Sequence, residues 1–466
     1  MSLRPRLSPR VATTAGPAVP GCSSAVPDTA AAAIRFSAPV PASRSTLIKF
    51  NMADLLTAAE AARRLGVKPA TLYAYVSRGL LGRDKAADGR ASLFHADEVE
   101  RLARRGRPRR PAGVADMTVE SAITEITGDS LRFRGLDATR LAVSRTFEEV
   151  AELLWTGEFR SPREPWQARP AALAAGRAAQ AALPAGTLPL ERLQVIVPAM
   201  AATDPLRLQL DQSAVVAAGR NVIAGMVDCL PPAAGGPAGP GGLPPAPGDP
   251  AGPGGPVAER LWSRLCDRRP SPGLMRAMSA ALVLLADHEL AASTLAARAA
   301  ASVRADPYAV VGTGLGAMSG ALHGGASLGA EILMAASSGP DDVPRVVAER
   351  LRRGEKVPGF GHFVYRGGDP RAVVLLDLVR RAAPKSGQLA VADAMLAEVR
   401  QKSLPEPNID FALATLAGVA GMVRGAGEAI FAVARTAGWI VHALEAYAGA
   451  GPLRPRAVYI GRPPVD

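Results

Sequence analysis

The sequence predicts an all-α protein, and three observations support this fold class. Hydrophobic residues make up 48% of the 466 positions but aromatic residues only 4%, which is typical of a helical interior filled with Ala, Leu and Val. Apolar residues recur three and four positions apart in segments 147–154, 282–299 and 430–444, with Gly or Pro in the gaps. No alternating stretch is long enough for a large sheet. The length suits about two or three domains.

Residues 1–52 form the first segment, which we expect to be disordered. They are rich in Pro, Ser, Ala and Arg with a single acidic residue, so they carry too little apolar surface to order themselves. The same composition is typical of an organelle transit peptide. Met52 stands just before the first periodic segment, so a start at that methionine is an equally good interpretation.

Residues 53–106 predict a small module that opens with two short helices joined at Gly66. Thr57 and Glu60 have the spacing of a capping box, in which each side chain accepts the backbone N–H of the other residue. Pro69 suits the first turn of the second helix. Residues 53–111 carry thirteen basic and seven acidic side chains, and this net charge of +6 would attract phosphate groups.

This layout resembles the winged helix-turn-helix of MerR and excisionase-type DNA-binding domains. The resemblance implies that the second helix is a recognition helix and that a wing follows it. The candidate DNA-binding residues are Thr71, Tyr73, Tyr75 and Arg78. DNA is therefore a candidate partner, yet a docking or regulatory module without DNA affinity could have the same fold. Both interpretations stay open.

Two segments of biased composition punctuate the rest of the chain. Residues 107–112 form a basic linker, and residues 231–256 form a Pro- and Gly-rich loop that we expect to be solvated and flexible. Residues 112–466 carry 35 basic and 34 acidic side chains, so most of the net charge of +12 lies in the amino-terminal part.

The cysteine and hydropathy patterns favour a cytoplasmic protein. Cys22, Cys229 and Cys266 form no CxxC pair and no even set, which argues against a disulfide framework or a zinc site and fits a reducing compartment. The longest strongly apolar stretch, residues 411–423, has 13 residues and is too short to cross a bilayer. We therefore predict no membrane span and no metal.

Three of the five histidines stand in turn-rich segments, which makes them candidates for chemistry. His288 lies between two acidic residues, and His323 and His362 have glycine neighbours that allow close approach of the backbone to a ligand. Taken alone, a histidine beside glycines is more often a structural turn. Asp410 alone would be a helix N-cap, and Arg371 a surface charge.

An ordered set of motifs changes that balance. The segments are 120–123 (ESAI), 132–135 (RFRG), 286–289 (ADHE), 320–326 (GALHGGA), 358–362 (PGFGH), 369–372 (DPRA), 407–411 (PNIDF) and 431–439 (FAVARTAGW). From residue 113 to residue 466 the chain thereby resembles the citrate synthase family. The resemblance implies a large helical domain and a smaller one at about residues 325–415 that closes over the ligands.

The resemblance also implies how three side chains divide the chemistry. Asp410 would take a proton from the methyl carbon of acetyl-CoA, and His323 would bind the thioester oxygen as charge develops on it. His362 would polarise the ketone of oxaloacetate. Each such acid–base or oxyanion role contributes about 10² to 10⁴ in rate. Coenzyme A enters as a substrate thioester, and no other cofactor is implied.

Further residues would bind the substrates. Guanidinium groups bind carboxylates bidentately, and the oxaloacetate-binding positions of the family match Arg371, Arg435, Arg454 and His288. In the family the arginine at the Arg454 position comes from the partner subunit, which implies an obligate homodimer. Coenzyme A is expected along Val357, Pro358, Gly359, Phe360 and Gly361.

Two departures from the family pattern affect the acyl donor. Ser327-Leu328 stands where Asn-Glu is common, and Phe363 where Arg is common. A 2-methylcitrate synthase that uses propionyl-CoA is therefore the alternative to a citrate synthase. A DNA-binding regulator whose synthase-like body senses ligands is a third interpretation, against which the complete set of His323, His362 and Asp410 weighs.

Overall fold

A computed structural model of the chain describes residues 55–65, 67, 69–77, 81–85, 92–96, 98–99, 119–162, 164–233, 254–449 and 451–455. The chain divides into two compact units, Met1–Asp116 and Met117–Asp466, which are described separately. The expected disordered segment 1–52, the basic linker 107–112 and most of the 231–256 loop lie outside the described residues.

Within its described residues, the first unit contains two helices and a small antiparallel sheet. Its elements are β1 (Leu55–Thr57), α1 (Ala58–Leu65), α2 (Pro69–Ser77), β2 (Asp84–Lys85) and β3 (Ser92–His95), with strand order β1-β3-β2. The predicted capping box is present: the Thr57 backbone N–H donates to Glu60 over 3.0 Å, and that of Glu60 to the Thr57 hydroxyl over 3.4 Å. Leu72 and Phe94 are fully buried in its core.

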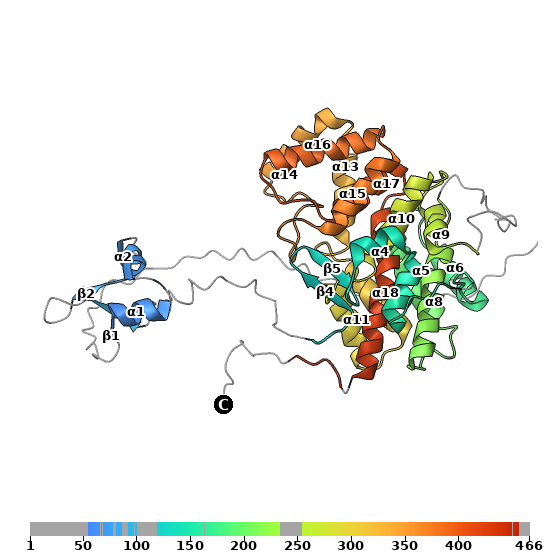
Figure 1. The fold of residues 1–466 in the computed structure, drawn as a ribbon, viewed down its shortest axis with the longest axis horizontal. Helices are drawn as coiled ribbons and strands as arrows, with labels where there is room; N and C mark the ends of the chain where they lie inside the picture. The colour runs from blue at the N-terminus through green and yellow to red at the C-terminus, as the bar shows by residue number, and fades with distance from the viewer. Residues whose placement is uncertain are drawn as a thin grey trace, which may run out of the picture. The chain divides into compact units, whose positions relative to one another are not determined.

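The second unit is mainly helical, as the sequence predicted (Figure 1). Its helices are α4 (Ala138–Ser144), α5 (Phe147–Thr156), α6 (Pro170–Ala181), α7 (Pro189–Ala201), α8 (Gln212–Cys229), α9 (Val257–Leu265), α10 (Pro272–Leu285), α11 (Ala292–Ser302), α12 (Pro307–Met318), α13 (Gly325–Ala335), η2 (Pro340–Asp342), α14 (Val343–Arg352), α15 (Pro370–Ala382), α16 (Gly387–Gln401), α17 (Ile409–Ala420) and α18 (Ala426–Ala448).

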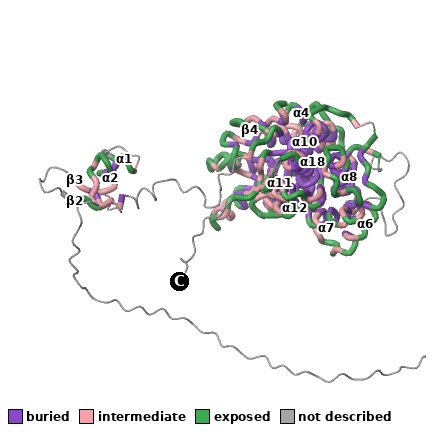
Figure 2. Tube along the Cα trace, turned by 90° about the horizontal axis from the view of Figure 1, so that it is seen from below, coloured by how far each residue is buried: buried purple, intermediate pink, exposed green. Residues whose placement is uncertain are grey.

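Helices α13 to α17 gather at one end of this unit, and the remaining helices surround α10 and α18 (Figure 1). The predicted limits of a small domain at about residues 325 and 415 stay a prediction. Figure 2 shows that α10 and α18 run through the most buried part of the unit. Among the described helices α18 alone is long and apolar enough to cross a membrane, but 83% of its most apolar window is buried inside the protein, as in a core helix.

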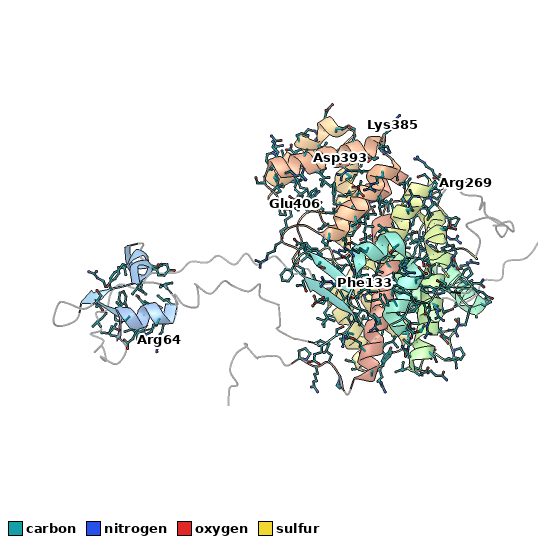
Figure 3. All side chains as sticks on the ribbon, viewed as in Figure 1. Arg64, Phe133, Arg269, Lys385, Asp393 and Glu406 are labelled. Carbon is teal, nitrogen blue, oxygen red and sulfur yellow. The ribbon has the colours of Figure 1, made fainter. Side chains whose placement is uncertain are left out.

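A three-stranded sheet in this unit was not predicted from the sequence. Strands β4 (Thr124–Thr127), β5 (Ser130–Phe133) and β6 (Leu136–Asp137) pair antiparallel in that order. Phe133, labelled in Figure 3, is fully buried and joins the sheet to the main core. Strands of four residues or fewer show too little alternation to be detected from sequence.

The periodic segment 282–299 does not form one helix. Helix α10 ends at Leu285 and α11 begins at Ala292, with a turn between them that carries Asp287 and His288. Glu289 has φ +54°, a left-handed conformation that no helix tolerates. The apolar periodicity continues across the turn because both flanking helices face the same core.

Candidate active site

His288 stands in the α10–α11 turn and is 7% exposed. Its Nε2 lies 3.0 Å from the Tyr365 hydroxyl, and its ring meets the His362 ring edge-on at a centroid distance of 5.2 Å. Burial, followed by the charges of Arg371 and Arg435, holds the pKa of His288 well below its ordinary value. The ring is therefore neutral and contributes a single N–H donor.

His362 follows the glycine-rich segment 359–361. Its Nδ1 accepts the backbone N–H of Val364 at 3.0 Å and that of Tyr365 at 3.3 Å. Burial, with a contribution from Arg371, lowers the pKa of His362 to about 4. A neutral imidazole that accepts at Nδ1 carries its proton on Nε2. Arg371 Nη2 lies 3.4 Å from this Nε2, so two donors converge on the same space.

Arg371, in the first turn of α15, is 2% exposed and held by a carboxylate. It donates from Nε to Asp369 Oδ1 over 2.9 Å and from Nη2 to Asp369 Oδ2 over 2.8 Å. Although burial raises the pKa of Asp369, Arg371 holds it below its ordinary value. Asp369 also accepts the backbone N–H of Ile409 at 3.0 Å, which ties the start of α17 to this pair.

Arg435, on α18, is fully buried. Its Nε donates to the Leu285 carbonyl over 2.8 Å, and its guanidinium carbon stands 4.7 Å over the Phe431 ring. Burial lowers the pKa of Arg435 to about 10, so the group stays charged at neutral pH. Nη1 and Nη2 have no partner among the described residues. Buried cationic donors without partners are costly, which favours a bound anion at this position.

Asp410 lies in the first turn of α17, next to the capping residue Asn408, whose Oδ1 accepts the Asp410 backbone N–H at 3.0 Å. Its Oδ1 is buried without a hydrogen-bond partner among the described residues. Burial raises the pKa of Asp410 to about 7, although Arg371 and Arg435 oppose the shift. A carboxyl group that titrates near neutrality and has a free oxygen is suited to proton transfer.

His323 stands between α12 and α13, and its Nε2 lies 2.7 Å from the Ser293 hydroxyl. That hydroxyl accepts the Trp439 indole N–H at 3.3 Å, so its own proton points to His323 Nε2. The His323 proton is then on Nδ1. Burial, with Arg435, lowers the pKa of His323 to about 4. The ring is 5.9 Å from that of Phe431.

The structure thus brings six predicted residues into one environment. Phe431 contacts both His323 and Arg435, and the charge of Arg435 also acts on His288 and Asp410. The set is His288, His323, His362, Arg371, Arg435 and Asp410. Two buried guanidinium groups, three neutral imidazoles and one carboxyl near neutrality can bind a small dianion and transfer a proton beside it.

The backbone conformation and close packing of segment 357–361 require glycine at two positions. Gly359 and Gly361 both have φ +83°, and a Cβ on Gly359 would lie 2.8 Å from that of Phe411. The Gly359 carbonyl accepts the Asn408 backbone N–H at 2.9 Å, and the Gly361 N–H donates to the Glu406 backbone carbonyl over 2.8 Å. The segment therefore fixes the residues that precede α17, with Val357 buried and Pro358 partly buried.

A separate cavity of about 630 Å³ opens between α5, α8 and the loop around Asp204. It shares no lining residue with the cluster above. Each of its arginines faces a carboxylate, in the pairs Arg160–Glu158, Arg169–Asp204 and Arg220–Glu152. Its cations are already paired, unlike Arg435, and we assign it no role.

Comparison with known proteins agrees with this geometry. The family model for the citrate synthase C-terminal domain matches residues 113–456, about three-quarters of the chain. The chain belongs to the citrate synthase family. It is an acyltransferase of the type that converts the acyl group to an alkyl group on transfer.

Several family members can be compared in more detail. The chain is 36% identical to citrate synthase 2 of Bacillus subtilis over 212 residues, which are 44% of this chain and 56% of that protein. It is 30% identical to citrate synthase of Mycolicibacterium smegmatis (76% of this chain, 96% of that one) and 30% identical to 2-methylcitrate synthase of Mycobacterium tuberculosis (75% and 88%). The citrate synthase structure from Thermotoga maritima superposes with a TM-score of 0.61 at 25% identity, covering 76% of this chain and 96% of the other.

The amino-terminal unit matches a helix-turn-helix domain over residues 55–107, as the sequence predicted. Thr71 and Tyr73 are exposed on α2 and Tyr75 is partly buried, whereas Arg78 lies outside the described residues. Arg454 is exposed on segment 451–455, where the neighbouring Leu453 backbone N–H donates to Ser302 over 2.9 Å. The structure does not bring Arg454 into contact with the six-residue cluster within the described chain.

Sequence reasoning missed side chains that organise this six-residue cluster. Tyr365 contacts His288 and His362, and Ser293 sets the tautomer of His323. Of the residues that position the cluster, Asp369 stands in one of the family motifs, 369–372. Tyr365 and Ser293 gave no signal, because a hydroxyl group near a motif in sequence does not show what it contacts in space. His442, on α18, also lies in a buried polar network.

Proposed function

We propose that this protein is a citrate synthase, which condenses acetyl-CoA with oxaloacetate and hydrolyses the product to citrate and free coenzyme A. The observation that carries the proposal is a pair of unmet polar groups: the terminal nitrogens of Arg435 and the Oδ1 of Asp410. A dicarboxylate supplies acceptors to the first group, and a weakly acidic C–H supplies a proton to the second.

The diacid would be held by cations and oriented by imidazoles. Arg371 and Arg435 are rigid, since one is paired with Asp369 and the other is bonded to the Leu285 carbonyl. Their free N–H groups bind the two carboxylates of oxaloacetate. The Nε2–H of His362, together with His288, donates to its remaining oxygens, and a donor at the ketone oxygen makes the carbonyl carbon more electrophilic.

Carbon–carbon bond formation then follows from the remaining two groups. The ionised Asp410 removes a proton from the methyl carbon of the thioester, the C–H electron pair forms a C=C bond, and the carbonyl π pair moves to the oxygen. The resulting enolate oxygen accepts a hydrogen bond from His323 Nδ1–H. The enolate carbon attacks the ketone carbon, and the ketone oxygen takes the proton of His362 Nε2–H, which the proton gained by Asp410 offsets. Water finally cleaves the thioester, giving citrate and the free thiol. The thioester is expected along segment 357–361, and the reaction needs no cofactor beyond this substrate.

The test is release of free thiol from acetyl-CoA in the presence of oxaloacetate. Replacing Asp410 by Asn should lower turnover by at least about 10²-fold, because the base is lost, while oxaloacetate still binds. Turnover by D410N equal to that of the wild type would contradict the assignment. Asp393→Asn, an exposed carboxylate on α16, is the matched control.

Propionyl-CoA is the alternative acyl donor, and two observations favour testing it. Ser327, where Asn is common, is fully buried, and its hydroxyl has no hydrogen-bond partner in the described part of the chain. Phe363, where Arg is common, is 84% exposed next to His362. A relative of similar identity is named 2-methylcitrate synthase. The thioester with the higher kcat/KM is the substrate.

We further propose that the active unit is a homodimer in the cytoplasm, with Arg454 of one subunit completing the oxaloacetate site of the other. Arg454 is exposed beyond α18, while Arg371 and Arg435 are buried, so the former is available to a partner. The free, buried thiols of Cys229 and Cys266 suit a reducing compartment.

The helix-turn-helix unit is proposed to bind DNA through α2. Thr71 and Tyr73 would face the duplex, and the basic residues of the unit would contact phosphate groups. Electrophoretic mobility shifts at about 50 and about 200 mM salt test this, because phosphate contacts weaken steeply with salt. If the protein binds DNA but releases no thiol, the alternative of a DNA-binding regulator with a ligand-sensing body is supported instead.

A further inference from the structure

The segment that carries His288 runs alongside α18 and is attached to it at three successive points. The Leu285 carbonyl accepts from Arg435 Nε at 2.8 Å, and the Ala286 carbonyl accepts the Gly438 backbone N–H at 2.9 Å. One residue further, Asp287 Oδ1 lies 3.4 Å from His442 Nε2. The contact between segment 285–287 and α18 therefore positions two site residues from different elements, His288 and Arg435.

The close approach depends on a glycine. A Cβ on Gly438 would lie 2.3 Å from Asp287 Oδ1 and 2.6 Å from the Ala286 carbonyl oxygen. Any other residue at position 438 would push the segment away from the helix. The absence of a side chain here lets the carboxylate of Asp287 reach α18 one turn beyond Arg435.

Asp287 and His442 are both fully inside the protein, with 0% and 1% exposure. Asp287 Oδ2 accepts the Thr124 hydroxyl at 2.6 Å and the Glu289 backbone N–H at 3.1 Å. Asp287 Oδ1 and His442 Nε2 make no standard hydrogen bond to any described residue, and they face each other across the 3.4 Å contact. Loss of the imidazole would therefore leave this buried carboxylate oxygen without the N–H that faces it.

The other side of the imidazole fixes its tautomer. Arg298 Nη1 donates to His442 Nδ1 over 3.0 Å and to Glu445 Oε2 over 2.5 Å. Since arginine only donates, Nδ1 accepts and the His442 proton is on Nε2, facing Asp287. The result is a continuous row across the core, in the order Glu445, Arg298, His442 and Asp287, which ends beside Arg435.

We propose that His442 and Asp287 are positioning residues for the diacid site, which hold the His288 turn against α18 so that His288 and Arg435 face the same carboxylate. This inference rests on the proposed function, since the bound diacid is oxaloacetate. The role is indirect: neither side chain touches substrate. This role differs from simple packing because the network ends at Asp287. Asp287 adjoins both His288 and Arg435, the two residues proposed to bind the diacid.

The test compares His442→Ala with His442→Gln by calorimetric titration of oxaloacetate and by steady-state kinetics. Glutamine can donate from Nε2 to Asp287 and accept from Arg298. H442A should weaken oxaloacetate binding by about tenfold and raise its KM accordingly, with the thioester KM unchanged, and H442Q should restore affinity to within about threefold. A purely structural role would lower stability without separating the two KM values.

Two further variants keep the test decisive. Thr124→Val removes the hydroxyl that holds Asp287 Oδ2 with little change in volume, and should show the same selective loss if H442A fails to fold. Tyr447→Phe is the matched control, since it removes a 2.5 Å bond to the Ala305 carbonyl from the same helix, away from the site. Oxaloacetate affinity that is equal in T124V, Y447F and the wild type would overturn the inference. No binding by the wild type would instead reject the proposed function, and the inference with it.

Discussion

The Asp410 carboxyl lies at the start of α17, where burial opposes its ionisation and the two site arginines favour it. Burial is the larger effect, so the pKa rises to about 7. Such a group is a stronger base than an ordinary aspartate and is still ionised in about half of the molecules at neutral pH. His323 and His362, for which we propose catalytic roles, behave oppositely, because burial lowers the pKa of each to about 4 and keeps them neutral donors.

A pH–rate profile follows from these values. Because the base must be ionised, kcat/KM for the thioester should rise about tenfold per pH unit below pH 7 and level off above it. The histidines are neutral throughout that range and add no second inflection. Initial rates from about pH 5.5 to 8.5 at constant ionic strength measure the profile. A profile that stays flat between about pH 5.5 and 7 would contradict the role of Asp410.

The same shift predicts a pH-dependent effect of D410N on stability. The folded pKa is raised, so the contribution of Asp410 to stability is complete below the unfolded value of 3.8 and is lost as pH rises through about 7. Asparagine does not ionise. D410N should therefore unfold less readily than the wild type at pH 8, by up to about 4 kcal/mol, and equally at about pH 4. Urea unfolding at both pH values checks this, and D393N should show no such pH-dependent difference.

At the scale of elements, α18 is capped by a side chain from another helix. Glu331 on α13 accepts the backbone N–H of Gly425 at 2.7 Å and that of Gly427 at 2.8 Å. Gly425 is the N-cap of α18 and Gly427 lies in its first turn, where an acidic group also interacts favourably with the helix dipole. A Cβ on Gly427 would lie 2.4 Å from the Ser327 hydroxyl, so the glycine is what lets the two helices approach.

Replacing Glu331 by Ala should therefore destabilise the whole second unit. Two hydrogen bonds to a charged group are lost and two N–H groups lose their acceptor, which together cost about 2 to 4 kcal/mol. Glu331→Gln keeps one acceptor and should lose about half as much. Glu349→Ala on α14, whose ion pair with Arg345 is exposed, should change stability by less than about 0.5 kcal/mol. Equal unfolding free energies for E331A and E349A would show that the cap contributes nothing.

Elements that depend on residues close together in the sequence could be predicted, and elements that depend on distant contacts could not. The capping box of Thr57 and Glu60 was predictable because its two residues are local in sequence. The break at Asp287 was not predicted from periodicity, since both flanking helices present apolar faces to the same core. The short strands β4 to β6 depend on pairing with each other and carry no pattern of their own.

The residues of the candidate site also differ in whether the sequence alone could predict them. The six clustered residues could be predicted because each stands in a motif with distinctive neighbours. Ser293, Tyr365 and His442 could not, because their roles come from contacts with residues 30, 77 and 144 to 155 positions away. Partners in space at such separations leave no trace in a single sequence.

At the scale of the whole molecule, the two compact units have separate hydrophobic cores, so neither needs the other to fold. The chain's net positive charge also lies almost entirely in the amino-terminal part. Residues 117–466 should therefore retain full thiol-releasing activity when the first unit is removed, while DNA affinity disappears. Activity and gel-shift measurements on the shortened chain check both expectations, and loss of turnover would indicate that the units depend on each other.

The proposed dimer makes a sharper prediction, because each site would then take Arg454 from one subunit and His362 from the other. Arg454→Ala and His362→Ala should each be inactive alone. When the two chains are co-expressed, a mixed dimer has one site with both lesions and one site with neither. Random pairing gives about half mixed dimers, each with one intact site, so about a quarter of wild-type activity should return. Differently tagged chains allow the mixed dimer to be purified, where the recovered activity should approach half. If the purified mixed dimer is as inactive as its parents, Arg454 serves the site of its own chain.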